Sequence, residues 1–146
     1  MASINVGRVV MGGVAAGAVM SACDFVINQF ILADAWTRVA QARNVDMSAM
    51  GGAGDFVKFV AIDLMLGLLI VWTYAAIRPR LGQGPGTAMT AAFAVFLAEA
   101  LVMATFAPWL FSWDMFIRSN ALGLISTLAA GVAGAWVYTE AEEESA

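Results

Sequence analysis

The segment from Phe56 to Ile77 reads FVKFVAIDLMLGLLIVWTYAAI, and it decides the fold of this chain. Its only charged side chains are Lys58 and Asp63. A transmembrane helix needs about 20 predominantly apolar residues to cross a hydrocarbon core of about 30 Å. The segment is therefore long enough and apolar enough to span a membrane.

Three more apolar runs of similar length accompany this segment, at residues 4–32, 87–110 and 115–138. None of the four runs has the polar face that a surface helix of a soluble protein turns toward water. The composition agrees, since 62% of the 146 residues are hydrophobic and 12% are charged, whereas soluble domains carry about 25% charged residues. We predict an all-α integral membrane protein with a single domain of four transmembrane helices.

The connections between the runs predict how the helices follow one another. The first connection, residues 33–55, is the longest, and residues 34–43 can either extend the first helix or form a short amphipathic helix at the membrane surface. The second connection, residues 78–86, contains Pro79 and Pro85, which should end one helix and begin the next. The third, residues 111–114, is very short. Short connections join antiparallel neighbours, so we expect an up-down-up-down bundle.

Charged residues near the helix ends bear on orientation and partners. Arg78 and Arg80 lie in a short connection without an acid, where they can anchor at lipid headgroups and where positive charge favours the cytoplasmic side. We therefore expect both termini in the cytoplasm. The acidic residues of the tail, residues 139–146, indicate a solvated end of the chain. There is no basic patch, so nucleic acid is not an expected partner.

Small residues recur every four positions in two of the runs. Such stripes let helix backbones approach closely in lipid, where the hydrophobic effect does not drive helix association. We predict that both stripes are contact faces between helices. Their members are Gly13, Gly17 and Ser21 in the first run, and Gly123, Thr127, Gly131 and Ala135 in the last.

A few polar side chains interrupt the apolar runs, and they form the candidate functional cluster. Each charge at the centre of a membrane helix costs about 2.5–3.5 kcal/mol on insertion scales, and counting along the helices places all of them in the same half of the bilayer. Three interpretations stay open. The first is an internal clamp in which Arg118 pairs with Glu99 or Asp63 and the asparagines satisfy Asp24. The second is a chamber that binds a cation or relays protons, and the third is an interface with a partner subunit. The cluster comprises Asp24, Asn28, Asp63, Glu99, Arg118 and Asn120.

The sequence lacks the residues that metal, haem or phosphate sites usually need. The chain has no histidine and a single cysteine, so we expect no histidine-ligated metal or haem and no zinc or iron–sulfur site. It has no phosphate-binding glycine loop either. We therefore predict no catalytic residues, no metal, no cofactor and no enzymatic activity.

The connection YAAIRPRLGQGPGTA, residues 74–88, resembles a family of small bacterial four-helix membrane proteins that carry a YAAIRPRxGxGPxTA-like turn. The flanking glycine patterns VMGGVAAG, residues 10–17, and AGAWVY, residues 133–138, add to the resemblance. The family has no assigned activity. The resemblance implies the four-helix architecture and a bacterial inner membrane, and it implies no functional site.

Taken together, the sequence favours a non-catalytic accessory or scaffold subunit that packs against membrane lipids and against other membrane proteins or further copies of itself. The alternative is a small proton- or cation-coupled carrier or channel that uses Asp24, Asp63 and Glu99. An accessory subunit would copurify with a larger complex in mild detergent, whereas a carrier would be active alone in liposomes.

Overall fold

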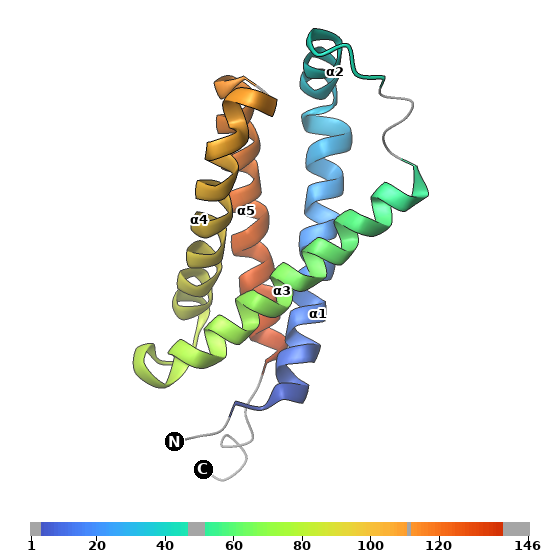
Figure 1. Ribbon diagram of the computed structural model, residues 1–146. Coiled ribbons are helices and arrows are strands. Elements are labelled where there is room, and N and C mark those ends of the chain that lie inside the picture. Colours follow the sequence, from blue (N-terminus) through green and yellow to red (C-terminus); the bar gives the residue numbers. More distant parts are fainter. Residues whose placement is uncertain (1–3, 47–51, 111, 139–146) are drawn as a thin grey trace.

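The computed structural model of the chain describes residues 4–46, 52–110 and 112–138. These residues are helical and contain no β-strand (Figure 1). The predicted all-α class is confirmed, and four helices have the length and composition to cross a membrane. The acidic tail at residues 139–146 lies outside the described residues. The elements in order are α1 (Val6–Val26), the π-helix η1 (Ile27–Ile31), α2 (Ala33–Ala42), α3 (Ala53–Leu81), α4 (Pro85–Leu110) and α5 (Trp113–Val137).

The first apolar run forms one long helix, Val6–Ile31, that changes type near its end. The α-helix ends at Val26, and the next turn is a π-helix in which the Leu32 amide donates to the Ile27 carbonyl at 2.8 Å. The side chain of Asn28 donates to the Asp24 carbonyl at 2.8 Å. In a regular α-helix the backbone amide of Asn28 would bond this carbonyl, so the side chain competes with the backbone at the point where the helix changes type. The short amphipathic segment follows as a separate helix, α2.

The second connection is tighter than the sequence indicates. Pro79 does not end the helix, as we expected it to, but lies inside the last turn of α3. The helix ends at Leu81, and Gly82 follows with φ +82°, a backbone conformation that glycine adopts readily. Near a helix end, a proline removes one backbone hydrogen bond without disturbing a long stretch of helix. Pro85 is the first residue of α4, as expected.

Glycines bring α1 and α3 into backbone contact. A methyl group added to Gly13 would meet the Leu68 Cα at 2.8 Å, and one added to Gly17 would meet the Leu64 Cα at 2.6 Å. Gly67 faces both glycines from the α3 side. Later residues of α1 thus meet earlier residues of α3, so the two helices run in opposite directions. The small-residue stripe of the first run is a contact face of α1.

The stripe of the last run also lies between helices, although its members are not equally close to them. A methyl group on Gly131 would meet the Ala92 Cβ of α4 at 2.6 Å. One on Gly123 would make only an ordinary van der Waals contact with Phe96, at 4.0 Å. The Thr127 hydroxyl donates to the Gly123 carbonyl of its own helix at 2.8 Å. Ala135 packs against the buried core.

Most of the core lies in one half of the bundle, the half where α1 begins and α5 ends. Its members come from α1 as far as Met20, from the second half of α3, from the first half of α4, and from the second half of α5 with the residue that follows it: Val9, Ala16, Met20, Ile70, Val71, Tyr74, Ala75, Ala88, Ala91, Ala92, Val95, Ala130 and Tyr138. In the other half, α3 runs obliquely away from α4 and α5 (Figure 1). The early α3 side chains Phe59 and Met65 are each 66% exposed there. The bundle is therefore closely packed at one end and open at the other.

Candidate functional site

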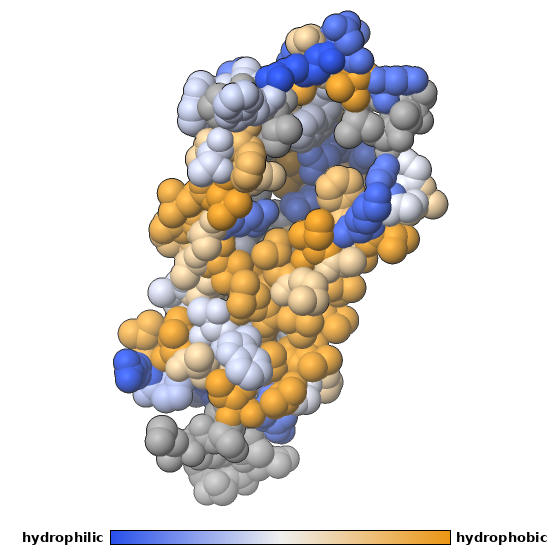
Figure 2. Space-filling view, in the orientation of Figure 1, coloured by the Kyte–Doolittle hydropathy of each residue, from blue (hydrophilic) through white to orange (hydrophobic). Residues whose placement is uncertain are grey.

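Three of the predicted polar side chains converge from three different helices. Asp24 on α1, Asp63 on α3 and Glu99 on α4 lie close enough for their carboxyl groups to interact electrostatically with one another. They lie where the packed half of the bundle gives way to the open half. The space-filling view shows a recess in the upper half of the molecule, in which hydrophilic residues are visible between apolar surfaces (Figure 2). We call these three residues the carboxylate cluster.

Asp63 is the most buried member of the carboxylate cluster. Its residue is 8% exposed, and its Oδ2 accepts a hydrogen bond of 2.7 Å from the Ser21 hydroxyl of α1. Ser21 stands one helical turn beyond Gly17, so the close approach of α1 and α3 brings the hydroxyl within reach. The last member of the predicted α1 stripe therefore serves as a hydrogen-bond donor to the cluster.

Asp24 lies next to Ser126 on α5, so all four long helices contribute to the site. The Ser126 hydroxyl lies close enough to the Asp24 carboxyl group to act as its hydrogen-bonding neighbour, although no group of the described residues meets ordinary hydrogen-bond geometry with it. Ser126 is only 2% exposed. A buried hydroxyl without a well-formed hydrogen bond is costly and usually marks a place where a water, an ion or a ligand completes the bonding. Sequence reasoning missed Ser126, although a serine in the middle of an apolar run is itself a signal.

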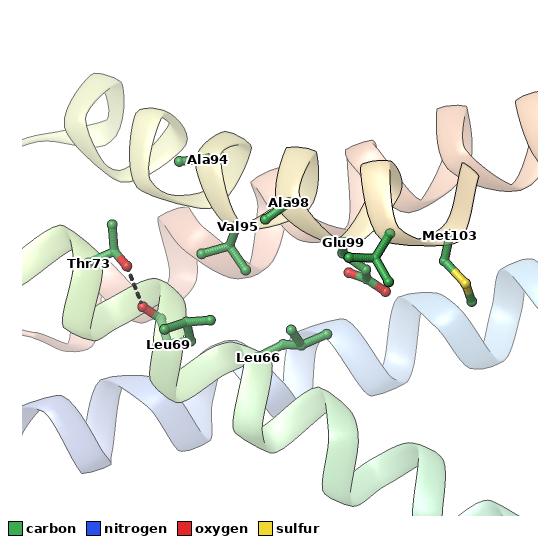
Figure 3. A pocket seen from close by; sticks show the side chains of 9 residues that line it. Leu66, Leu69, Thr73, Ala94, Val95, Ala98, Glu99 and Met103 are labelled. Carbon is green, nitrogen blue, oxygen red and sulfur yellow. Dashed lines mark hydrogen bonds between the residues drawn. The ribbon is translucent and has the colours of Figure 1, made fainter. Parts of the chain in front are cut away.

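Glu99 extends the cluster into a groove between α3 and α4. Figure 3 shows its carboxyl group pointing from α4 toward α3, between Leu66 and Met103. The groove has a volume of about 590 Å³ and is otherwise lined by apolar side chains and Thr73. The Thr73 hydroxyl donates to the Leu69 carbonyl of its own helix at 2.8 Å. Among the described residues, Glu99 is thus the only charged side chain on the groove wall.

The predicted internal clamp does not form. The Arg118 Nε lies 3.0 Å from the Asp114 Oδ1 on the same helix, and both side chains are more than half exposed. Four residues apart on α5, the two are adjacent on the helix surface, so pairing needs no second helix. Among the described residues, no lysine or arginine forms an ion pair with Asp24, Asp63 or Glu99.

The two asparagines are also bonded elsewhere. Asn28 donates to the Asp24 backbone carbonyl and accepts a 2.8 Å hydrogen bond from the Trp36 indole of α2, which ties α2 to the end of α1. Asn120 donates to the Phe116 carbonyl of its own helix at 2.8 Å. Their amides therefore stabilise helix geometry and leave the cluster carboxyl groups without an amide partner.

The predicted headgroup anchors lie at the opposite end of the bundle from α2. The Arg78 guanidinium is 6.0 Å from the ring centre of Tyr138, which follows α5, and it donates to the Gln83 side chain at 2.5 Å. Arg80 is exposed. Tyr74 and Tyr138 stack edge to face with ring centres 5.9 Å apart, so the end of α3 and the end of α5 meet at the level of these arginines.

The chemistry available to the carboxylate cluster follows from its charges. Like charges brought together in a medium of low polarity cannot all stay ionised unless a cation joins them. Inside a membrane the cluster would therefore hold protons, bind a cation, or exchange one for the other. No group of three or more potential ligands in the described residues is tight enough to hold a metal ion by itself.

Comparison with protein-family models, with curated protein sequences and with solved structures finds no match to this chain. The function must therefore be argued from the geometry of the site.

Proposed function

We propose that the chain is a multi-pass protein of the bacterial cytoplasmic membrane, an up-down-up-down bundle with both termini in the cytoplasm. The four long apolar helices support insertion. So do large apolar side chains that would be costly to expose to water, among them Trp136 at 83% and Trp109 at 77% exposure. The bacterial assignment rests on the resemblance of the turn at residues 74–88, and the cytoplasmic side on Arg78 and Arg80.

Within the membrane, we propose that the protein acts as a small proton- or cation-coupled carrier. The observation that carries this proposal is the carboxylate cluster, which has no basic partner among the described residues and lies beside the buried hydroxyl of Ser126. A structural role would be better served by a paired charge, since an unpaired charge inside the membrane is costly. A carrier needs such unpaired carboxyl groups, because they can exchange a proton for a cation.

The open groove between α3 and α4 determines how such a carrier would be built. One chain leaves Glu99 exposed on the side of the bundle, so it does not enclose a path through the membrane by itself. We propose that the working form is a homo-oligomer in which copies of the chain together enclose the path.

The test uses purified protein in liposomes that contain a pH-sensitive dye, with an imposed membrane potential and with lithium, sodium, potassium or tetraphenylphosphonium salts outside. The wild-type protein should move protons faster than empty liposomes do, and Glu99→Gln should abolish the difference. Asp114→Asn is the matched control, because Asp114 is an exposed acid outside the cluster. Equal fluxes for wild type, Glu99→Gln and empty liposomes with every salt would refute the carrier.

The second candidate is the accessory or scaffold subunit favoured by the sequence. The observation in its favour is the apolar groove between α3 and α4, which a helix of another membrane protein could cover. An accessory subunit would copurify with a larger complex in mild detergent and would show no flux in liposomes. A copurifying partner whose contact with this chain includes Glu99 would support this candidate.

A further inference from the structure

We propose that the groove between α3 and α4 binds an amphiphilic organic cation, whose positive group pairs with Glu99 and whose apolar part lies along the groove. This inference rests on the proposed carrier function and names the class of its cargo.

The walls allow only one kind of polar contact. The side chains around Glu99 are Leu66, Leu69, Val95, Val102 and Met103, together with two alanines. The hydroxyl of Thr73 is already bonded to its own helix. A ligand with several hydrogen-bonding groups would leave them unsatisfied here, which is costly. A ligand with one diffuse positive charge and a large apolar surface matches both the walls and the carboxyl group.

The size and the depth of the groove also point to this class. Its volume of about 590 Å³ lies within the roughly 300–1,000 Å³ typical of sites for drug-sized ligands. At about 1.5 Å per residue, Glu99 lies roughly 20 Å from the start of α4 and roughly 16 Å from its end. A lipid headgroup stays at the membrane surface and would not reach this depth, whereas an amphiphilic cation dissolved in the membrane would.

The polar groups next to Glu99 allow a proton to be exchanged for the bound cation. Asp24 on α1 and Asp63 on α3 interact electrostatically with Glu99, and α5 contributes the buried hydroxyl of Ser126 beside Asp24. The two charged residues of α5, Arg118 and Asp114, pair with each other and not with the cluster. A cation that pairs with Glu99 displaces a proton from the cluster, and a proton that returns displaces the cation. The hydroxyl of Ser126 provides a donor and acceptor for that proton next to Asp24.

A second groove provides a matched control within the same molecule. It has a volume of about 530 Å³ and lies between α4 and α5, lined by Met89, Leu128, Ala129, Val132, Ala133 and Trp136. It is as apolar as the first groove and of similar size, but it has no carboxyl group. A ligand that recognises the charge should distinguish the two grooves, whereas a ligand that recognises only apolar surface should not.

The experiment measures binding of radiolabelled tetraphenylphosphonium to the full chain in detergent by equilibrium dialysis. Wild type should bind it saturably, and Glu99→Gln should bind it at least tenfold more weakly. Ala98→Phe, which fills the Glu99 groove, should also weaken binding, while Ala129→Phe in the second groove should leave it unchanged. Glu99→Asp keeps the charge and should retain most of the binding. Triphenylphosphine oxide, a neutral compound of related shape, should not compete.

Several results would overturn the inference. The inference fails if the wild type shows no saturable binding of tetraphenylphosphonium, or if Glu99→Gln binds it as tightly as the wild type does. It also fails if triphenylphosphine oxide competes as well as unlabelled tetraphenylphosphonium. The groove would then be a site for lipid chains or for another helix. If Glu99→Gln does not fold, the contrast between Ala98→Phe and Ala129→Phe decides alone. Proton flux without phosphonium binding would refute the inference and leave the carrier intact. Binding without any flux would refute the carrier and leave the binding site intact.

Discussion

The contact between α1 and α3 holds the carboxylate cluster together, and Gly67→Ala tests it. A methyl group at Gly67 would lie 2.9 Å from the Gly17 Cα and 2.5 Å from the Gly17 backbone nitrogen. Carbon atoms in ordinary contact are about 3.5–4.0 Å apart, so the helices would have to separate by roughly 0.6–1 Å. Both obstructing atoms belong to the backbone, so no side-chain rotation relieves the clash.

The expected loss follows from two opposing effects. Overpacking a close contact costs about 1–3 kcal/mol, while replacing glycine by alanine in a helix gains at most about 1 kcal/mol. Gly54→Ala serves as the control because it lies in the same helix and its methyl group would meet nothing within 4 Å. We expect Gly67→Ala to be less stable than Gly54→Ala by about 1–3 kcal/mol.

The assay is reversible unfolding in mixed detergent micelles with increasing sodium dodecyl sulfate, followed by circular dichroism. The difference between the two alanine variants reports mainly the packing effect, because both replace a glycine of α3 by alanine and only Gly67 faces another helix. Equal stability, or a more stable Gly67→Ala variant, would show that the backbones of α1 and α3 do not approach at Gly67. The arrangement that brings Ser21 to Asp63 would then be wrong as well.

Three further predictions concern the site and the orientation. Ser21→Ala removes the 2.7 Å hydrogen bond to the Asp63 carboxyl group and should lower the free energy of unfolding by about 1–3 kcal/mol; an unchanged unfolding curve would contradict that bond. Arg118→Ala should change stability by less than about 1 kcal/mol, since it breaks an exposed pair on one helix, whereas a large loss in the same unfolding assay would restore the internal clamp. Single cysteines at Gly54 and Gly86, where a side chain meets open space, should react in a Cys23→Ala background with membrane-impermeant reagents from opposite sides, Gly86 from the cytoplasm. Reaction of both from one side would refute the four-span topology.

The helices of this protein were predictable, because each long apolar run needs only its own composition to specify a helix. The ends were harder to predict. The helix Val6–Ile31 changes from α to π at Ile27, where the side chain of Asn28 competes with the backbone for the Asp24 carbonyl. Pro79 falls in the last turn of α3, where the helix tolerates it. Both effects depend on one or two hydrogen bonds, which hydropathy does not register.

The candidate site was predictable in part. The membrane cost of charge singles out Asp24, Asp63 and Glu99, but it does not say which groups they meet. Arg118 could reach an acid on another helix or the acid four residues earlier, and the nearer one, Asp114, is its partner. The groove could not be predicted either, since it arises from the oblique path of α3 across the bundle (Figure 1). A helix crossing is set by packing between segments distant in the sequence, and the glycines of α1 and α3 only become informative once they face each other.

The most direct test of the carboxylate cluster counts the protons that it exchanges. Purified protein in weakly buffered detergent solution is titrated with lithium, sodium and potassium chloride and with tetraphenylphosphonium, while a pH indicator records proton release. The wild-type protein should release protons as at least one of these cations binds, and the combined variant Asp24→Asn, Asp63→Asn, Glu99→Gln should release none. Equal release from both proteins, or none from the wild type with every cation, would show that the cluster does not exchange protons for a cation.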